Sequence, residues 1–222
     1  MARLFAISDI HGCYRPFKEL VLKEIDLRKE DRLILLGDYV DRGDQSRQVI
    51  DFIRDLKKSG FDVIVLTGNH EQMMLDSYSD PLMLPLWFLN NGMTTLESFG
   101  LEDITDIPPD YIKFLAGLEY YHEQGDYLFV HAGFNDLSPD PFSDRHIMIW
   151  ECRPSYRNPL LTGKTIIHGH RPKTIEYVKK LILEKSPVIP IDTGCVYEKE
   201  LNYGYLSALE VNSMKLISIP NW

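Results

Sequence analysis

Polar residues able to bind metal ions stand in several short segments of the chain, each next to a glycine. The candidate ligands are Asp9, His11, Asp38, Asn69, His131 and His170. Carboxylate and amide oxygens combined with imidazole nitrogens, without thiolates, suit Mn²⁺, Fe²⁺, Fe³⁺ or Zn²⁺ better than Ca²⁺ and exclude a structural cysteine-type zinc site. Six ligands exceed what one catalytic ion usually needs. Two ions that share one carboxylate would use them all.

The glycines beside these segments carry further information. Because glycine lacks a Cβ atom, it permits positive φ and lets the backbone approach a ligand closely. Turn chemistry alone accounts poorly for so many glycines beside candidate ligands, so the pattern indicates a binding site. The glycines are Gly12, Gly37, Gly43, Gly68, Gly133 and Gly169.

The elements that position these residues alternate between strand and helix in the first third of the chain. Three short apolar runs predict buried strands, at residues 3–8, 32–36 and 61–66, and apolar residues at helical spacing predict helices between them. This β-α-β-α-β order is typical of a parallel sheet covered by helices. Each run ends directly before a polar segment, and ligands bind outside the carboxyl ends of strands in such sheets. We therefore expect the polar segments to meet at one edge.

The rest of the chain breaks this alternation. Prolines and helical patches over about residues 80–118 indicate a helical insertion that caps the site, and the second half is rich in β-pattern segments. Without a repeat or a low-complexity linker, we expect one continuous domain over residues 1–222, an α/β fold of two mixed sheets packed together with helices outside. The later segments grouped as β-rich are 119–122, 127–130, 165–167, 176–184, 188–191, 203–210 and 215–219.

Composition excludes several classes of protein. The 222 residues carry a formal net charge of −9, which disfavours general binding to nucleic acid or to an anionic membrane. No run approaches the ~18 apolar residues that a membrane span needs. Three cysteines, far apart and without a CxxC pair, suggest no disulfide framework, so we expect a cytoplasmic protein. The oligomeric state stays open.

Taken together, the polar segments resemble the five sequence blocks of the calcineurin-like metallophosphoesterases. The form of the second and third blocks is specific to the phosphoprotein phosphatase branch, which includes the serine/threonine phosphatases, and the short length resembles its prokaryotic and phage members and the related diadenosine tetraphosphatases. The resemblance implies the fold of that family. The blocks are Asp9-Ile10-His11-Gly12, Gly37-Asp38-Tyr39-Val40-Asp41-Arg42-Gly43, Gly68-Asn69-His70-Glu71, His131-Ala132-Gly133 and Gly169-His170.

The resemblance also implies a role for each ligand. Asp9 and His11 would hold the first metal and Asp38 would bridge both; the second metal would be held by Asn69, His131 and His170. We expect two divalent cations, first of all Mn²⁺, with Fe, Zn or Ni as alternatives. A hydroxide that bridges the metals would then attack phosphorus in line with the leaving oxygen.

Four further residues receive catalytic roles from the same resemblance. His70, oriented by Asp41, would donate a proton to the departing oxygen, and Arg42 would bind the phosphoryl oxygens. Arg153 is the candidate for the family's second phosphate-binding arginine, although its spacing from Trp150 is one residue too long. The chain also departs from the family at Arg171, where a small or hydroxyl residue usually follows the last Gly-His.

We expect a metal-dependent phosphomonoesterase of the serine/threonine protein phosphatase type, acting on phosphoserine, phosphothreonine or also phosphotyrosine. The alternative is a hydrolase of dinucleoside polyphosphates such as diadenosine tetraphosphate, because both reactions are in-line attacks on phosphorus. The substrate is thus a phosphoprotein, a phosphopeptide or a dinucleoside polyphosphate, and no nucleic-acid or membrane partner is expected. For an adenine site, candidate stacking residues are Trp87, Trp150 and Tyr156.

Two other classes fit less well. A non-catalytic module with this fold would be expected to have lost His70 or Asp38, and both are present. Nuclease relatives usually end the last block as Gly-His-x-His, whereas Pro172 stands two residues after His170.

Overall fold

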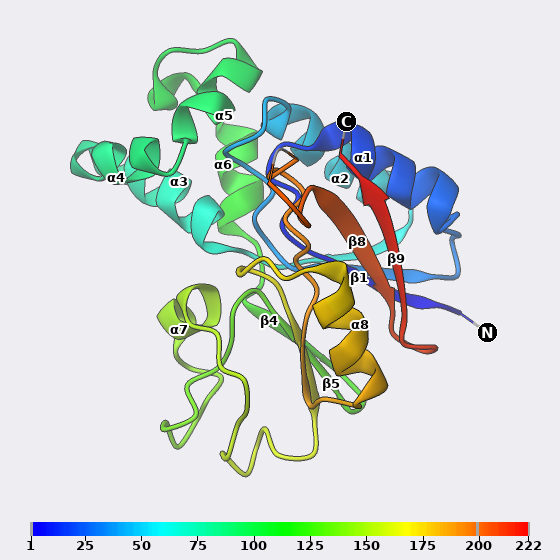
Figure 1. The fold of residues 1–222 in the computed structure, drawn as a ribbon. Helices are drawn as coiled ribbons and strands as arrows, with labels where there is room; N and C mark the ends of the chain where they lie inside the picture. The colour runs from blue at the N-terminus through cyan, green and yellow to red at the C-terminus, as the bar shows by residue number, and fades with distance from the viewer. Residues whose placement is uncertain (1, 199, 222) are drawn as a thin grey trace.

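Two mixed β-sheets lie face to face at the centre of the molecule (Figure 1). The structure is a computed structural model and describes residues 2–198 and 200–221. The first sheet has the order β3-β2-β1-β8-β9 and the second the order β4-β5-β6-β7. Strands β1 to β3 pair in parallel, as do β5 to β7, while β4, β8 and β9 pair antiparallel with their neighbours. The strands are β1 (Leu4–Ile7), β2 (Arg32–Leu35), β3 (Asp62–Val65), β4 (Tyr121–Gln124), β5 (Tyr127–Val130), β6 (Thr165–His168), β7 (Val188–Pro190), β8 (Tyr205–Glu210) and β9 (Lys215–Pro220).

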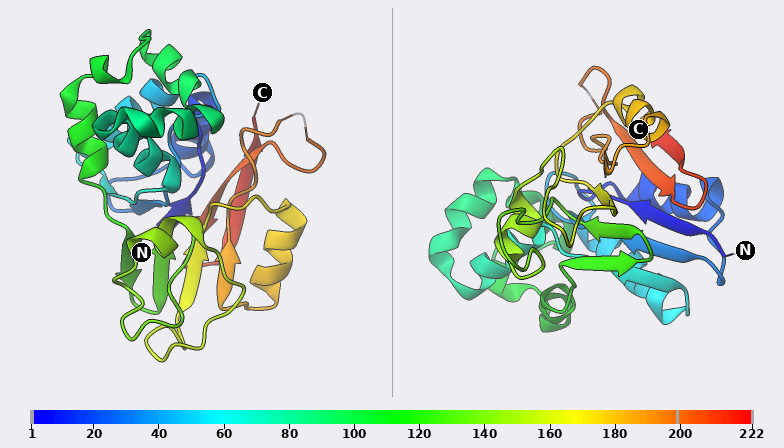
Figure 2. Two further views of the ribbon diagram at one scale, coloured as in Figure 1. Left: turned by 90° about the vertical axis from the view of Figure 1, so that its left-hand side faces the viewer. Right: turned by 90° about the horizontal axis from the view of Figure 1, so that it is seen from below.

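Helices cover the outer faces of both sheets. Figure 2 shows that those between residues 69 and 116 gather at one end of the sheets, whereas α8 lies beside β7, the edge strand of the second sheet. Val178 of α8 packs into the apolar layer between the sheets. None of the described helices has the length and apolar character needed to cross a bilayer. The helices are α1 (Tyr14–Glu19), which continues as the π-helix η1 (Leu20–Glu24), α2 (Ser46–Lys58), α3 (Asn69–Ser79), the 3₁₀ turn η2 (Pro81–Met83), α4 (Leu84–Leu89), α5 (Gly92–Phe99), the 3₁₀ turn η3 (Ile104–Asp106), α6 (Pro109–Ala116), α7 (Arg145–Trp150) and α8 (Ile175–Leu183).

The strand residues alternate between two apolar cores. In β1, Leu4 and Ala6 face the layer between the sheets, while Phe5 and Ile7 face the helices. Residues of β5 to β7 divide in the same way between the central layer and a third core on the outer face of the second sheet. Because side chains alternate along a strand, continuous apolar runs mark strands that are buried on both faces. This is why the short runs of the sequence are strands.

The predicted architecture of two mixed sheets with helices outside is confirmed, with differences inside two segments. The segment 176–184, which the sequence pattern places in the β-rich half, is helical up to residue 183 and belongs to α8, where the Thr174 hydroxyl caps the first turn by accepting the N–H of Tyr177. Within the segment over about 80–118, α4 and α5 are separated at Asn91, which adopts a left-handed conformation. The segment over about 80–118 is helical as expected. That the chain forms a single domain stays a prediction.

Candidate metal centre and active site

The six candidate ligands lie at the carboxyl ends of strands from both sheets. The parallel pairing of β1 to β3 and of β5 with β6 brings these ends together, as expected for open α/β sheets. The ligands follow β1 (Asp9 and His11), β2 (Asp38), β3 (Asn69, the first residue of α3), β5 (His131) and β6 (His170).

One cluster of possible metal ligands is formed by His11, Asp38 and His70, which can each offer an atom within 4.8 Å of the others. Nε2 of His11 lies 3.4 Å from Oδ2 of Asp38. Nδ1 of His11 donates to the carbonyl of Val40 at 2.9 Å, which leaves the lone pair on Nε2. Burial, together with the nearby Arg42 guanidinium, holds the pKa of His11 well below its usual value, so the ring is neutral.

A second cluster contains Asp38, His131 and His170. Nε2 of His131 lies 3.0 Å from Oδ1 of Asn69, 3.1 Å from Nδ1 of His170 and 3.5 Å from Oδ1 of Asp38. Nδ1 of His131 donates to the carbonyl of Leu36, and burial lowers the pKa of the ring. Its Nε2 lone pair therefore points into the cluster, toward Asn69, His170 and Asp38.

Asp9 stands beside both clusters and belongs to neither. Its carboxylate accepts the backbone N–H of His170 at 3.0 Å and the hydroxyl of Ser8. Asp9 and Glu71 add to the effect of burial in raising the pKa of the Asp38 carboxyl well above its usual value. Buried acceptors that crowd together in this way fit cations, which would offset their charge and accept their lone pairs.

Two glycines leave room for the carboxylates. A Cβ atom at Gly68 would overlap with the carboxylate of Asp38, and one at Gly169 would overlap with Ser8 and the carboxylate of Asp9. Neither glycine has positive φ. Close approach, and not backbone conformation, is therefore what these positions require.

Backbone strain is concentrated in the same segments. Non-glycine residues with positive φ cost about 1–3 kcal/mol each and persist only where the surrounding structure holds them. Their clustering here indicates that side-chain direction at the site matters more than local backbone energy. Those among the candidate site residues are Asp9, His11, Asp38, Asp41, Arg42 and His170, with φ between 44° and 70°.

His70, a member of the first cluster, also forms a buried pair with Asp41. Nδ1 of His70 lies 2.7 Å from Oδ2 of Asp41, and Nε2 of His70 is buried with no hydrogen-bond partner in the structure. The Asp41 carboxylate also accepts the indole N–H of Trp87 at 2.9 Å and the hydroxyl of Thr95 at 2.7 Å. Two residues from helices α4 and α5 thus hold the aspartate that orients the histidine.

Glu71 has a role that sequence reasoning did not assign. Its fully buried carboxylate accepts the backbone N–H groups of Asp38, Tyr39 and Gly68 at 2.7–2.9 Å. Burial raises the pKa of Glu71, while these N–H groups oppose that rise. Glu71 therefore fixes the backbone that carries Asp38, and the capping-box position three residues after Gly68 was the available sequence signal.

The sequence pattern of calcineurin-like phosphoesterases matches residues 2–197. The chain belongs to this family. Membership implies bound divalent metal ions, and the neutral imidazoles, amide oxygen and carboxylates described above fit such ions.

Several relatives are named for activity on dinucleoside tetraphosphates. A symmetrical bis(5'-nucleosyl)-tetraphosphatase of Nitrosospira multiformis is 34% identical over 134 residues, which cover 59% of this chain and 43% of the relative. An asymmetrical bis(5'-nucleosyl)-tetraphosphatase of Anoxybacillus flavithermus is 25% identical, with coverage of 97% and 93%. The chain thus spans less than half the length of the symmetrical relatives that it matches.

Solved structures of the family share the fold. A protein provisionally assigned as a diadenosine tetraphosphatase superposes with a TM-score of 0.68 at 22% identity, covering 100% of this chain and 94% of the other. A cold-active protein tyrosine phosphatase of Shewanella gives 0.59 at 18% identity, with coverage of 100% and 78%.

The remaining predicted residues of this phosphoesterase lie in different places. Arg42 donates from Nη1 to Nε2 of His11 at 2.6 Å and is therefore part of the site. Arg153 lies in a separate cavity with Arg171, and none of the hydrogen bonds or ion pairs of the described residues joins it to the six candidate ligands.

The three candidate stacking residues also differ. Trp87 is fully buried and bonded to Asp41, so the idea that it faces a substrate is wrong. The hydroxyl of Tyr156 accepts the N–H of Phe134, and its ring packs on the third core. Only Trp150 lies near a candidate ligand, with its ring centroid 6.3 Å from that of His170.

Proposed function

We propose that this chain hydrolyses dinucleoside polyphosphates in a reaction that depends on two divalent cations. The observation that carries the proposal is the meeting of acceptor atoms around Asp38 beside the Asp41–His70 pair. The names of the relatives favour this substrate over the phosphomonoesters to which the sequence motifs gave first place. We propose Mn²⁺ as the metal, since the mixed oxygen and imidazole ligands suit it.

The chain's own residues divide the chemistry between them. Bound cations supply an activated water and offset the negative charge of the phosphate. Arg42, released from its bond to His11, is free to bind the phosphoryl oxygens with its planar fork. His70 protonates the leaving oxygen from Nε2, and the Asp41 carboxylate orients the ring through Nδ1.

The test compares two substrates on the same Mn²⁺-loaded protein. We expect kcat/KM to be at least about tenfold higher for diadenosine tetraphosphate than for a phosphoserine peptide, which corresponds to about 1.4 kcal/mol of transition-state binding. Chromatography of the products separates symmetrical cleavage, which yields two ADP, from asymmetrical cleavage, which yields ATP and AMP. Preference for the phosphopeptide would restore the phosphomonoesterase interpretation, and chelator-insensitive turnover would contradict the metal centre.

Trp87→Phe tests how the Asp41–His70 pair is held. The substitution removes the indole N–H donor at 2.9 Å from Asp41 and retains an aromatic ring in the core. A hydrogen bond to a charged group contributes about 1.5–3 kcal/mol, and the Thr95 hydroxyl remains, so we expect kcat to fall about tenfold. Steady-state kinetics should show little change in KM, and calorimetric titration with Mn²⁺ little change in metal binding.

The neighbouring Phe88 provides the control for this variant. Its ring packs 5.7 Å from that of Trp87, it is 36% exposed, and it makes no bond to Asp41. Phe88→Leu should therefore retain the wild-type kcat. An unchanged kcat in Trp87→Phe would show that the indole only fills the core.

A further inference from the structure

A cavity of about 300 Å³ lies between α8, the ends of β6 and β7, and the segment that follows α7. Its position is at the β7 edge of the second sheet, beside α8, which is drawn in gold (Figure 1). Its lining combines cationic and apolar side chains. The cationic residues are Arg153, Arg171 and Lys173, and the aromatic and aliphatic ones include Tyr177, Leu181, Val188 and Pro190.

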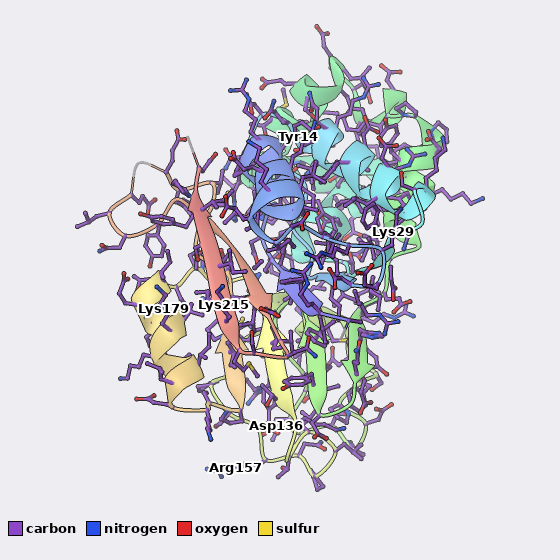
Figure 3. The ribbon with its side chains drawn as sticks, turned by 90° about the vertical axis from the view of Figure 1, so that its right-hand side faces the viewer. Tyr14, Lys29, Asp136, Arg157, Lys179 and Lys215 are labelled. Carbon is purple, nitrogen blue, oxygen red and sulfur yellow. The ribbon has the colours of Figure 1, made fainter. Side chains whose placement is uncertain are left out.

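The cationic lining is unusual for a chain with a net charge of −9. Among the described residues, no carboxylate lines the cavity and no ion pair includes any of its three cations. The Nε atom of Arg153 is buried with no hydrogen-bond partner. Arg153 helps to lower the pKa of Asp136, but it forms no ion pair with that carboxylate, which already accepts the N–H groups of Arg157 and Asn158. Asp136 and Arg157 lie in the outer loops (Figure 3).

A single loop connects this cavity with the candidate metal centre. His168 and Arg171 line the cavity, whereas His170 between them contributes to the second ligand cluster. Consecutive Cα atoms are only about 3.8 Å apart, so the side chain of Arg171 leaves the backbone directly beside a metal-centre residue. A substrate with phosphorus at the metal centre could therefore extend past Arg171 into the cavity.

The aromatic part of the lining offers a surface for a flat ring. Tyr177 is 44% exposed, and the ammonium of Lys173 lies 5.9 Å from the centre of its ring. Aromatic side chains stack well on nucleobases, while unpaired arginine and lysine side chains bind phosphate oxygens. The cavity thus combines groups suited to a phosphate chain with a ring suited to a base.

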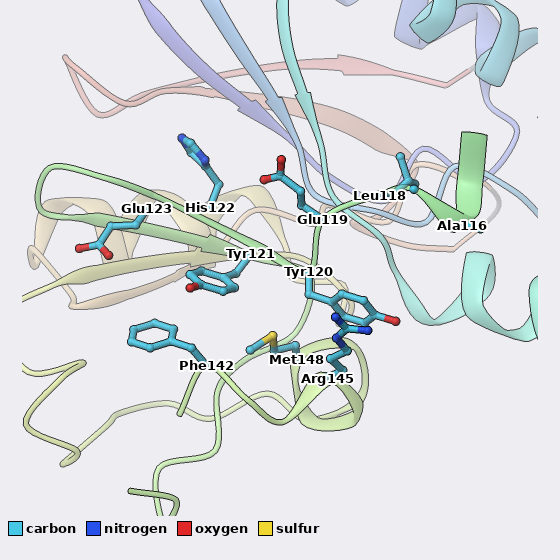
Figure 4. A pocket seen from close by; sticks show the side chains of 11 residues that line it. Ala116, Leu118, Glu119, Tyr120, Tyr121, His122, Glu123, Phe142, Arg145 and Met148 are labelled. Carbon is cyan, nitrogen blue, oxygen red and sulfur yellow. The ribbon is translucent and has the colours of Figure 1, made fainter. Parts of the chain in front are cut away.

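A larger cavity differs in its charge. It has a volume of about 650 Å³ and lies beside β4 and α7, where Tyr121 and Phe142 stack and Arg145 covers Tyr120 (Figure 4). Two carboxylates, Glu119 and Glu123, line it. Its arginine, Arg145, therefore shares the cavity with two carboxylates, so the lining lacks the excess of positive charge that a polyphosphate needs.

We propose that the cationic cavity binds the nucleotide end of the substrate that does not react. The phosphates contact Arg153, Arg171 and Lys173, and the base packs on Tyr177. The inference rests on the proposed function in requiring a substrate with more than one phosphate. It explains why Arg171 stands where the family usually has a small residue: the position gains a cation for the extended phosphate chain.

The first test measures binding without turnover. ADP is titrated calorimetrically into full-length protein kept in chelator, so that the metal centre takes no part. We expect Lys173→Ala and Arg171→Ala each to weaken ADP binding about ten- to hundredfold, since each removes a charge-assisted contact. Pyrophosphate should show the same loss, and Tyr177→Ala should weaken ADP binding but leave pyrophosphate binding at the wild-type level.

Lys179→Ala is the matched control. Lys179 is an exposed lysine of the same helix that does not line the cavity (Figure 3). The Lys179→Ala variant should bind ADP as the wild type does. Thermal melting shows whether each variant is folded. Because Lys173 is three residues from His170 in the sequence and Arg171 only one, Lys173→Ala keeps the test independent of damage to the ligand loop.

The outcomes separate this inference from the proposed function. ADP binding that depends on Lys173, in a protein that does not cleave diadenosine tetraphosphate, would support the cavity and reject the proposed reaction. Cleavage of the dinucleotide with ADP binding unaffected by Lys173→Ala would overturn the cavity and leave the reaction standing. With Mn²⁺ present, the loss of kcat/KM in Lys173→Ala should be larger for diadenosine tetraphosphate than for p-nitrophenyl phosphate, and equal losses would also overturn it.

Discussion

Replacing Asp38 with asparagine is expected to abolish metal-dependent turnover while the fold persists. Asp38 faces His11 with one carboxylate oxygen and His131 with the other, at 3.4 and 3.5 Å. Loss of outer-shell partners alone lowers metal affinity about 10- to 100-fold, so removal of a shared ligand should lower it more. Titration of Mn²⁺ by calorimetry and kcat on p-nitrophenyl phosphate measure the two effects.

The fold of the metal-free variant can be checked through its stability. Burial, with Asp9 and Glu71 nearby, raises the folded-state pKa of Asp38 well above 3.8. A carboxyl of this kind stabilises the fold below its unfolded-state pKa, and that contribution is lost as pH rises through the folded-state value. At neutral pH, Asp38→Asn should therefore melt no lower than the metal-free wild type.

Asp55→Asn, on the exposed face of α2, is the control for the same chemical change. It should match the wild type in metal binding and in turnover. Normal Mn²⁺ affinity in Asp38→Asn would contradict the bridging position that we assign to Asp38.

The meeting of the candidate ligands could be predicted from the sequence because local signals determine it. Short apolar runs identify the strands, parallel pairing aligns their carboxyl ends, and the ligands follow those ends directly. Asp9, Asp38 and Asn69 therefore had to lie near one another once the order β-α-β-α-β was recognised. The roles of these residues stay proposals.

The partners of Asp41 could not be predicted in the same way. Trp87 is 46 residues from Asp41 in the sequence and Thr95 is 54 residues away, and no periodicity links them. A tryptophan in a helical segment suits an apolar core and a binding surface equally well. Only the packing of α4 and α5 determines which of the two it occupies.

The cationic cavity was missed for a related reason. Lys173, Tyr177 and Leu181 line it from one side, and Leu181 belongs to a segment that was grouped with strands. A strand would also place Tyr177 and Leu181 on one face, because side chains alternate along it. Only the helix α8 places that face beside the cations of the cavity. Arg171 stands out in the sequence as a departure from the family, but no neighbouring residue in the chain explains it.

His70→Asn is expected to lower kcat about 10²- to 10⁴-fold, with the largest loss for substrates whose leaving group is a poor one. The Nδ1 atom of His70 is held by Asp41 at 2.7 Å, and its Nε2 atom is free to deliver a proton. Asparagine retains polarity but cannot supply that proton, so an alkyl phosphate with a basic leaving oxygen should suffer most and p-nitrophenyl phosphate least. The dependence of log kcat on the leaving-group pKa should therefore become steeper in the variant.

The comparison with other substitutions separates proton donation from simple damage to the site. Asp41→Asn should show the same trend at smaller magnitude, because the ring loses its orientation but keeps its proton donor. His146→Asn, at an exposed position on α7, should leave the leaving-group dependence unchanged. A disturbed metal centre slows every substrate alike. Equal losses across the series would therefore assign His70 to metal binding and remove it from proton transfer. Its place in the cluster with His11 and Asp38 also permits that role.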